Sequence, residues 1–316
     1  MQFTTPVNIQ HPRHEISYDD RILMIGSCFT ESISGKLLES YFRVATNPFG
    51  ILYNPASIAR CIEVILDNTP VSELPIVSHN GLWHSMLHHG DFSRADRQEA
   101  EAAFRRSIEE GRKALSEASV VIVTFGTAWV YETDGEIAGN CHKLPQDKFV
   151  RRRLTAEEIV SEWSGLLRHP LLKDKHFIFT VSPIRHIKDG LHENQLSKAT
   201  LLLAIDQLTG SQVHKFTTYF PSYEILIDEL RDYRFFAEDM VHPSSVAVDY
   251  IWERFSDTYF SAQTKQEMQP LHRLYCDLHH RPLHPDTEEY KRFREQTIEK
   301  ARALSKKYPW ISEELV

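Results

Sequence analysis

The sequence predicts an α/β fold: a three-layer α/β/α sandwich around a central parallel sheet, followed by a C-terminal helical extension. Apolar runs rich in β-branched and aromatic residues recur along the chain, as is typical of strands that are buried on both faces. Segments with helical spacing separate these runs, and this alternation indicates right-handed βαβ units with helices on both faces of the sheet. The predicted strands are Arg21–Ile25, Ser119–Phe125, His176–Val181 and Val213–Phe220.

The first strand follows an irregular lead-in over residues 1–20 and precedes a helix with Ile33, Leu37 and Tyr41 on one face. Asn47–Pro55 is rich in turn-forming residues and predicts a loop. Asp134-Gly135 predicts a hairpin turn within Tyr131–Lys148. Further helices are predicted over Ser57–Leu66, Asp96–Glu117, Thr155–Leu167, Ser197–Leu208, Tyr223–Leu230, Ser245–Phe260 and Thr287–Lys307.

The 316 residues are predicted to form a catalytic domain over residues 1–260 and a helical extension over residues 261–316. Prolines such as Pro270 and Pro282 interrupt the extension, which is expected to be a packing arm or a contact of a homo-oligomer. The formal charge of −8 argues against nucleic acid as a partner. The chain contains no apolar stretch of about 18 residues, so neither a membrane span nor a location outside the cytoplasm is expected.

Metal ligands are the first chemistry to consider. Four widely spaced cysteines without a CxxC pair predict neither a zinc site nor a disulfide framework. In the histidine-rich segment 79–92, His84 and His88 would share one face of a helix, as metal ligands do in some proteins. No third ligand is placed convincingly, so a loop that lines a substrate cleft is the preferred interpretation, and no metal or other cofactor is expected.

The turn Gly26-Ser27-Cys28 joins the first strand to its helix and has a serine at its apex. A hydroxyl there would stand at the mouth of the sheet, beside a helix N-terminus whose free N–H groups favour negative charge. Nucleophiles and half of an oxyanion hole are built in such turns. The same turn also occurs as a phosphate site or a helix cap, so Ser27 needs a partner elsewhere in the chain.

Asp239 and His242 are the partners predicted for Ser27. A carboxylate three residues from a histidine in a turn can bind one imidazole nitrogen while the other nitrogen faces a serine hydroxyl. An incidental surface turn is the alternative, but the two residues just precede the last helix of the predicted domain. Polar loops at Gly126 and at residues 185–194 also follow predicted strands, and all of these would meet at one edge of the sheet.

Several motifs resemble one family. They are GSCFTES, NPFGILYNP, VTFGTAWVYE, SPIRH with GLHENQLSKA, and AEDMVHPS. Together they span about residues 20–260 and are similar to the GSCFA family, a branch of the SGNH/GDSL-like hydrolases. The resemblance implies the flavodoxin-like form of the sandwich. It also implies that Ser27 is the nucleophile, Asp239 the orienting acid and His242 the general base.

The same resemblance implies an oxyanion hole built from the backbone N–H groups of Ser27 and Gly50. The wider superfamily adds an asparagine from a Gly-x-Asn-Asp block, but this chain has Gly126-Thr127-Ala128-Trp129 at that place. Asn47 or Thr127 are the candidates to replace the missing donor. If neither does, the rate would be about 100- to 1000-fold lower.

The expected function is hydrolysis of small acyl esters, with O-acetyl groups on carbohydrate as the suggested substrate class. Acyl transfer at the same site stays open, and so does a non-catalytic carbohydrate- or metabolite-binding module on this scaffold. Cys28 is a less favoured nucleophile, because it follows the turn apex and buried cysteines usually act as small apolar side chains. Candidate pocket-wall residues, for which ordinary loop hydrogen bonding is the competing interpretation, are His89, Arg185, His186 and Asn194.

Overall fold

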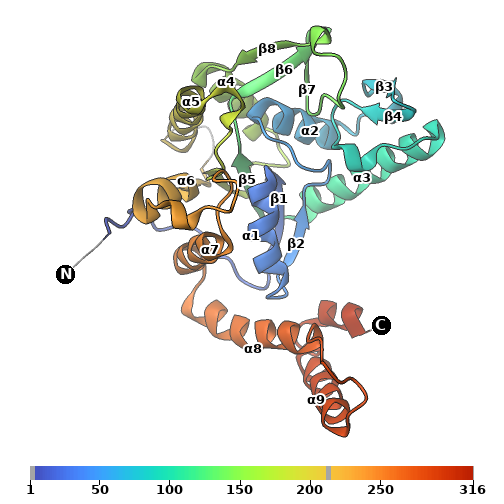
Figure 1. Ribbon diagram of the computed structural model, residues 1–316, viewed down its shortest axis with the longest axis vertical. Helices are drawn as coiled ribbons and strands as arrows, with labels where there is room; N and C mark the ends of the chain where they lie inside the picture. Colours follow the sequence, from blue (N-terminus) through green and yellow to red (C-terminus); the bar gives the residue numbers. More distant parts are fainter. Residues whose placement is uncertain (1–3, 211–214, 316) are drawn as a thin grey trace.

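The computed structural model describes residues 4–210 and 215–315, and a parallel sheet forms its centre (Figure 1). Within these residues the sheet has five strands in the order β10-β9-β5-β1-β2. In chain order this is the 2-1-3-4-5 arrangement of flavodoxin-like doubly wound folds. The bounds are β1 Arg21–Gly26, β2 Arg43–Thr46, β5 Val120–Phe125, β9 His176–Val181 and β10 Thr217–Phe220. Residues 213 and 214 of the last predicted strand lie outside the described residues.

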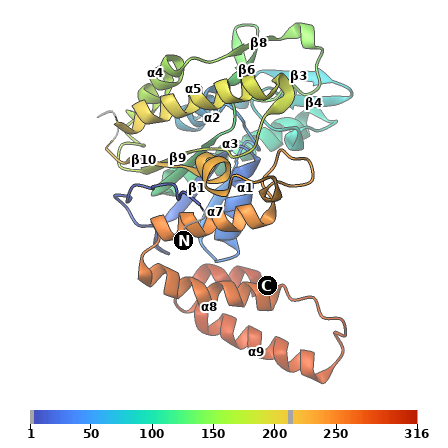
Figure 2. The same ribbon diagram turned by 60° about the vertical axis from the view of Figure 1, so that its left-hand side comes forward.

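The sheet has a hydrophobic core on each face, which confirms the predicted α/β/α sandwich. Because side chains alternate along a strand, Leu23 and Ile25 face one core while Ile22 and Met24 face the other. In Figures 1 and 2, α2, α3, α4 and α5 cover the first face and α1 and α7 the second. The helix bounds are α1 Cys28–Leu38, α2 Pro55–Asp67, α3 Arg97–Glu117, α4 Ala156–Leu167, α5 Leu191–Gly210, α6 Ser222–Glu224 and α7 Ser245–Tyr259.

Smaller antiparallel units flank this sheet. The expected hairpin forms from β6 (Trp129–Thr133) and β7 (Glu136–Ala138), with β8 (Val150–Arg153) on the other side of β6. A further hairpin of β3 (Ile76–His79) and β4 (Leu82–Ser85) turns at residues 80–81, both with positive φ. His84 therefore lies on a strand, so the helical face suggested for His84 and His88 does not form.

The C-terminal extension contains α8 (Ala262–Leu278), α9 (Glu288–Ser305) and a 3-10 helix over Pro309–Leu315, and it packs at the end of the sheet where α1 ends (Figure 2). The Trp310 indole N–H donates to the Tyr41 carbonyl at 2.8 Å, and Tyr308 packs on Tyr18 with ring centroids 5.1 Å apart. Pro270, which was expected to break the chain into shorter pieces, lies inside α8. Across residues 4–210 and 215–315, no helix combines the length and the apolar character that a bilayer crossing requires.

Candidate active site

The candidate site lies at the carboxyl edge of the parallel sheet, where β1 and β5 end. The strand order reverses between these two strands, and ligands of doubly wound sheets bind at such a switch point. β1 ends at Gly26, where a Cβ atom would lie 2.3 Å from the Thr124 carbonyl oxygen. Only glycine therefore allows the turn to pass so close to β5. Ser27 is the N-cap of α1, and Cys28 is the first residue of that helix.

Asp239 and His242 form a hydrogen-bonded pair beside this turn. The Nδ1 atom of His242 lies 2.6 Å from Asp239 Oδ2, and the backbone N–H groups of Val241 and His242 both donate to Asp239 Oδ1 at 2.9 Å. The N–H groups of His242 and Val241, together with the imidazole, lower the pKa of the Asp239 carboxyl to about 2. The aspartate thus stays ionised and fixes the tautomer in which Nε2 is free to accept a proton.

Arg185 holds the loop that carries this pair. Its guanidinium donates to the Met240 carbonyl, and its backbone N–H donates to the Val241 carbonyl at 3.2 Å. The guanidinium also lies over the Phe236 ring, 4.5 Å from the centroid. Met240 has a positive φ of 58°, a strained value that these contacts maintain. Arg185 therefore positions the loop, in addition to its predicted place in the pocket wall.

The residue that faces His242 is Cys28. Its Sγ atom lies 3.9 Å from His242 Nε2, within hydrogen-bonding reach for sulfur. The Ser27 side chain is fully buried, and its Oγ atom has no hydrogen-bond partner among the described residues. The structure thus brings Asp239 and His242 together as predicted, but it pairs them with Cys28 and not with Ser27. The reason is local geometry, because the N-cap and first helical residues direct their side chains to different sides of the turn.

The environment of Cys28 keeps its thiol protonated at rest. Burial raises the pKa of the Cys28 thiol above its ordinary value, while its own N–H and that of Phe29 act in the opposite direction at the start of α1. A half-buried thiol of this kind needs a base to become a nucleophile. His242 Nε2 is placed to be that base.

Two of the four predicted oxyanion donors are already engaged. The Gly50 N–H donates to the Asn47 carbonyl at 2.7 Å, so it closes a turn and does not face a substrate. Glycine is required at position 50 for another reason, because φ is +79° and a Cβ atom would lie 2.2 Å from His89 Cβ. The Thr127 hydroxyl pairs with Ser197 Oγ at 3.0 Å and accepts from the Trp129 N–H at 3.2 Å.

Asn47 retains a donor that is available. Its Oδ1 atom accepts from the Gly26 N–H at 2.9 Å, which fixes the side chain against the turn that carries Cys28. Its Nδ2 atom is buried and has no partner within the described residues. The remaining predicted donor, the Ser27 N–H, makes only a long contact of 3.3 Å to the Thr124 carbonyl. The Asn47 amide is therefore the best-placed side-chain donor among the predicted set.

Of the predicted pocket-wall residues, His186 borders the space beside the turn. A Cβ atom on Gly126 would lie 3.2 Å from His186 Nε2 and 3.3 Å from Ser27 Cβ, so both border the space beside that glycine. His186 Nε2 is buried without a partner among the described residues, and burial lowers the pKa of His186 to about 3. Asn194 Oδ1 accepts from the His186 N–H at 2.9 Å and positions it. His89 lies on the Gly50 turn, with Nδ1 3.0 Å from Asp91 Oδ2.

Lys198 is a residue at this site that sequence reasoning missed. It lies in α5, is 1% exposed, and donates from Nζ to the Gly126 and Ser182 carbonyls at 2.7 Å each. Burial lowers the pKa of Lys198 to about 7. The signal in the sequence was a single lysine among the apolar residues of a predicted helix.

Two histidines of segment 79–92, His84 and His88, have structural partners. His88 contacts the hydroxyls of Ser85 and Ser107 at 2.8 and 3.1 Å, and His84 contacts the Ser93 hydroxyl at 2.7 Å. In the part of the chain that the structure describes, no group of three or more His, Cys, Asp or Glu side chains could hold a metal ion. These histidines fill hydrogen-bonding roles in the core beneath the β3–β4 hairpin.

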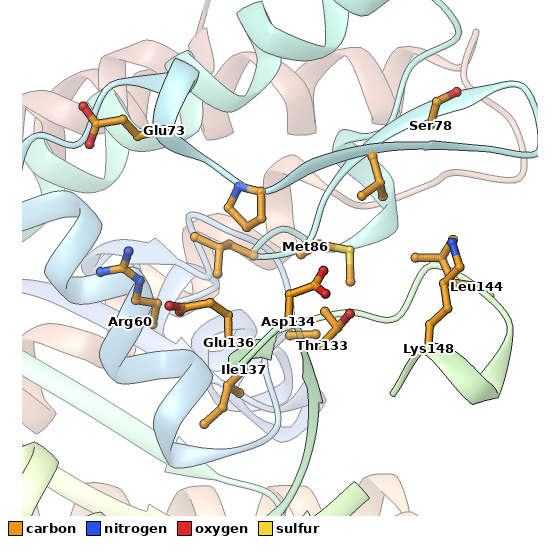
Figure 3. A pocket seen from close by; sticks show the side chains of 14 residues that line it. Arg60, Glu73, Ser78, Met86, Thr133, Asp134, Glu136, Ile137, Leu144 and Lys148 are labelled. Carbon is orange, nitrogen blue, oxygen red and sulfur yellow. The ribbon is translucent and has the colours of Figure 1, made fainter. Parts of the chain in front are cut away.

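A separate pocket of about 370 Å³ lies between the β3–β4 hairpin, the β6–β7 hairpin and α2 (Figure 3). Met86, Asp134 and Thr133 lie at its centre in this view, and Arg60 and Glu136 approach each other at one side. Segment 79–92 contributes Met86 and Leu87, so it does line a pocket. Cys28, His242 and His186 are not among the lining residues, and the pocket is therefore distinct from the candidate site.

Comparison with known proteins places the chain in a family. The model of the GSCFA family matches residues 21–255, which include β1, the Cys28 turn and the loop of Asp239 and His242. A second model, described as the C-terminal domain of GSCFA domain proteins, matches residues 272–314. A search of curated proteins found no match. Since the first match covers well over half of the chain, this protein belongs to the GSCFA family.

Proposed function

We propose that this protein is a thiol-dependent acyl hydrolase of the SGNH/GDSL-like type, with Cys28 as the nucleophile. The observation that carries the proposal is the geometry of His242, whose Nδ1 is 2.6 Å from Asp239 and whose Nε2 is 3.9 Å from Cys28 Sγ. A nucleophile, a base within reach of it and an acid that orients the base are the parts of a triad. The proposed substrates are small acyl esters, with O-acetylated carbohydrate as the leading class.

The reaction follows from these positions. His242 Nε2 takes the thiol proton as Cys28 Sγ attacks the ester carbonyl carbon. The Cys28 N–H at the start of α1 and the Asn47 amide stabilise the oxyanion of the tetrahedral intermediate. The intermediate collapses to a thioester as the alcohol leaves with the proton from His242. A water molecule, deprotonated by His242, then attacks the thioester and releases the acid and the free thiol.

Acyl transfer is the second candidate, and the neutral imidazole of His186 favours it. Its unpartnered Nε2 borders the space next to Ser27 and Gly126 and could accept a hydrogen bond from the hydroxyl of an incoming alcohol. That alcohol would replace water in the second step.

We also propose a reducing, cytoplasmic location, because all four cysteines are free thiols and Cys276 is exposed.

Hydrolysis of p-nitrophenyl acetate tests the proposal, in a Cys276→Ala background that removes the exposed thiol. We expect Cys28→Ala and His242→Ala to lower steady-state turnover by about 1000-fold or more, because each removes a member of the triad. Ser27→Ala should retain turnover within about tenfold, because Ser27 is fully buried and its hydroxyl makes no hydrogen bond with His242. If Ser27→Ala loses turnover and Cys28→Ala retains it, the nucleophile is Ser27 and not Cys28. If the parent protein and all folded variants fail to hydrolyse p-nitrophenyl acetate, a binding module is favoured.

A further inference from the structure

The pocket of Figure 3 is held open by hydrogen bonds between the elements that surround it. The Gly139 N–H donates to the Met86 carbonyl at 2.7 Å, and the Met86 N–H donates to the Pro75 carbonyl at 2.9 Å. On the other side, the Ser57 hydroxyl of α2 donates to the Ala138 carbonyl of β7 at 3.3 Å. These contacts join both hairpins and α2, so the pocket is formed before any ligand enters, as is typical of small-molecule sites.

The size and the lining of the pocket suit a small organic molecule. Its volume of about 370 Å³ lies within the range of ligand pockets. Met86, Leu87 and Ala138 are buried and form an apolar floor, and the half-buried Val77 and Ile137 line the walls. The two hairpins belong to separate small sheets and add no strand to the five-stranded sheet. The cavity that they enclose is therefore not a by-product of building the central sheet.

The charges around the pocket are predominantly negative. Three carboxylates and two cations line it: Glu73, Asp134, Glu136, Arg60 and Lys148. Arg60 already has a carboxylate partner outside the lining, since its Nη1 lies 3.4 Å from Glu63 Oε2. Within residues 4–210 and 215–315, the three lining carboxylates make no ion pair and no side-chain hydrogen bond. In Figure 3 the Asp134 carboxylate stands at the centre of the pocket, between Met86 and Thr133. An apolar floor thus lies beside a negative charge without a partner.

We propose that this pocket binds a small organic cation, namely an amine with an apolar body. The body would rest on Met86 and Leu87 while the ammonium group donates to the Asp134 carboxylate, a charge-assisted hydrogen bond. A metal ion is not the expected cation, because no group of three or more ligating side chains occurs in the described part of the chain. Cys28 and His242 do not line the pocket, so amine binding there is independent of the proposed acyl chemistry.

Methyl NMR of protein labelled with carbon-13 at methionine tests the proposal and locates the binding. Met86 reports on the pocket, and Met240 reports on the loop of the candidate active site; Met86→Leu and Met240→Leu assign the two signals. The probes are phenethylamine, phenethyl alcohol and phenylacetate, which are similar in size but are a cation, a neutral molecule and an anion at about pH 7. We expect the amine to shift the Met86 signal and to bind at least about tenfold more tightly than the alcohol. Phenylacetate should bind most weakly.

Two matched variants test the role of Asp134. Asp134→Asn removes the charge and keeps the hairpin turn, because Asn-Gly suits a turn with a φ of 52° at its first position. It should weaken phenethylamine binding by about fivefold or more and leave phenethyl alcohol unchanged. Asp147→Asn is the control, since Asp147 is an exposed acid of the same segment that does not line the pocket. It should leave the affinity for both probes within about twofold of the wild type.

Several results would overturn the proposal. Equal affinities for the amine and the alcohol would show that the carboxylates do not select a cation. Tighter binding of phenylacetate would assign the pocket to anions through Arg60 and Lys148. A shift of Met240 without a shift of Met86 would place the amine at the candidate active site. No shift of Met86 with any probe up to about 20 mM would remove the binding site itself. Equal losses in Asp134→Asn and Asp147→Asn would attribute the affinity to the overall negative charge of the protein.

Discussion

At the scale of single residues, the structure differs from the prediction in which of two neighbours, Ser27 or Cys28, faces His242. The sequence predicts the turn at residues 26–28 and the pair Asp239 and His242 as parts of the site. The structure places Asp239 Oδ2 2.6 Å from His242 Nδ1. Pattern alone could not choose between Ser27 and Cys28, because successive residues at a helix start point about 100° apart around its axis. The choice depends on the position of the 239–242 loop. This loop is held by contacts with Arg185, which is distant from it in sequence.

Asn47 offers a test of the oxyanion hole. Asn47→Asp keeps the oxygen that accepts from the Gly26 N–H and tolerates the positive φ of 45°, but it replaces the unpartnered amide donor with a carboxylate. We expect kcat for ester hydrolysis to fall by about 100- to 1000-fold or more, with KM changed much less, because the donor would act on the transition state. An unchanged kcat in a folded variant would exclude Asn47 as an oxyanion donor.

At the scale of elements, the prediction succeeded where hydrophobic periodicity is strong and failed where strands are short. The core strands, the Asp134-Gly135 hairpin and the capped helix from Thr155 agree with the sequence patterns. β2 was missed because its residues are only half-buried and four in number, which leaves no periodic signal. The β3–β4 hairpin was not predicted although Asn80-Gly81 is a strong turn signal, because the four-residue spacing of His84 and His88 also fits a helix.

Glycines in different elements should respond in opposite ways to alanine. At Gly50, a positive φ and a Cβ position 2.2 Å from His89 Cβ predict a loss of more than about 2 kcal/mol in the free energy of unfolding. At Gly35, inside α1, a Cβ atom meets nothing within 4 Å, so Gly35→Ala should stabilise the protein by up to about 1 kcal/mol. Urea unfolding of both variants measures these changes. A loss in Gly35→Ala as large as that in Gly50→Ala would contradict the argument.

At the scale of the whole molecule, buried histidines link stability to pH. Burial lowers the pKa of His88 and His186 to about 3 and that of His142 to about 4. The unfolded chain binds protons at these residues below about pH 6.5, whereas the folded chain does not. Their contribution to stability is therefore present above pH 6.5 and is lost as the pH falls toward 4. Glu162, whose pKa burial raises to about 7, takes up a proton in the folded protein over the same interval and offsets part of this loss.

Urea unfolding at about pH 7.5 and about pH 5 measures this effect. Each of the three histidines should contribute a loss of up to about 2 kcal/mol in the free energy of unfolding between these values. His88→Gln should show a smaller loss than the wild type over the same interval, because one of the three groups no longer takes up a proton on unfolding. Identical losses in the two proteins would show that His88 does not contribute.

The contact between the two ends of the chain has a consequence for synthesis on the ribosome. Tyr18 and Phe42, near the start, share one hydrophobic core with Tyr308 and Ile311, near the end. During translation, the opposite face of the sheet can complete its core from α2 to α5 while residues 308–311 are still inside the exit tunnel. The α1 face cannot, so the nascent chain exposes an unfinished apolar surface until Tyr308 and Ile311 have left the tunnel and can pack against Tyr18 and Phe42.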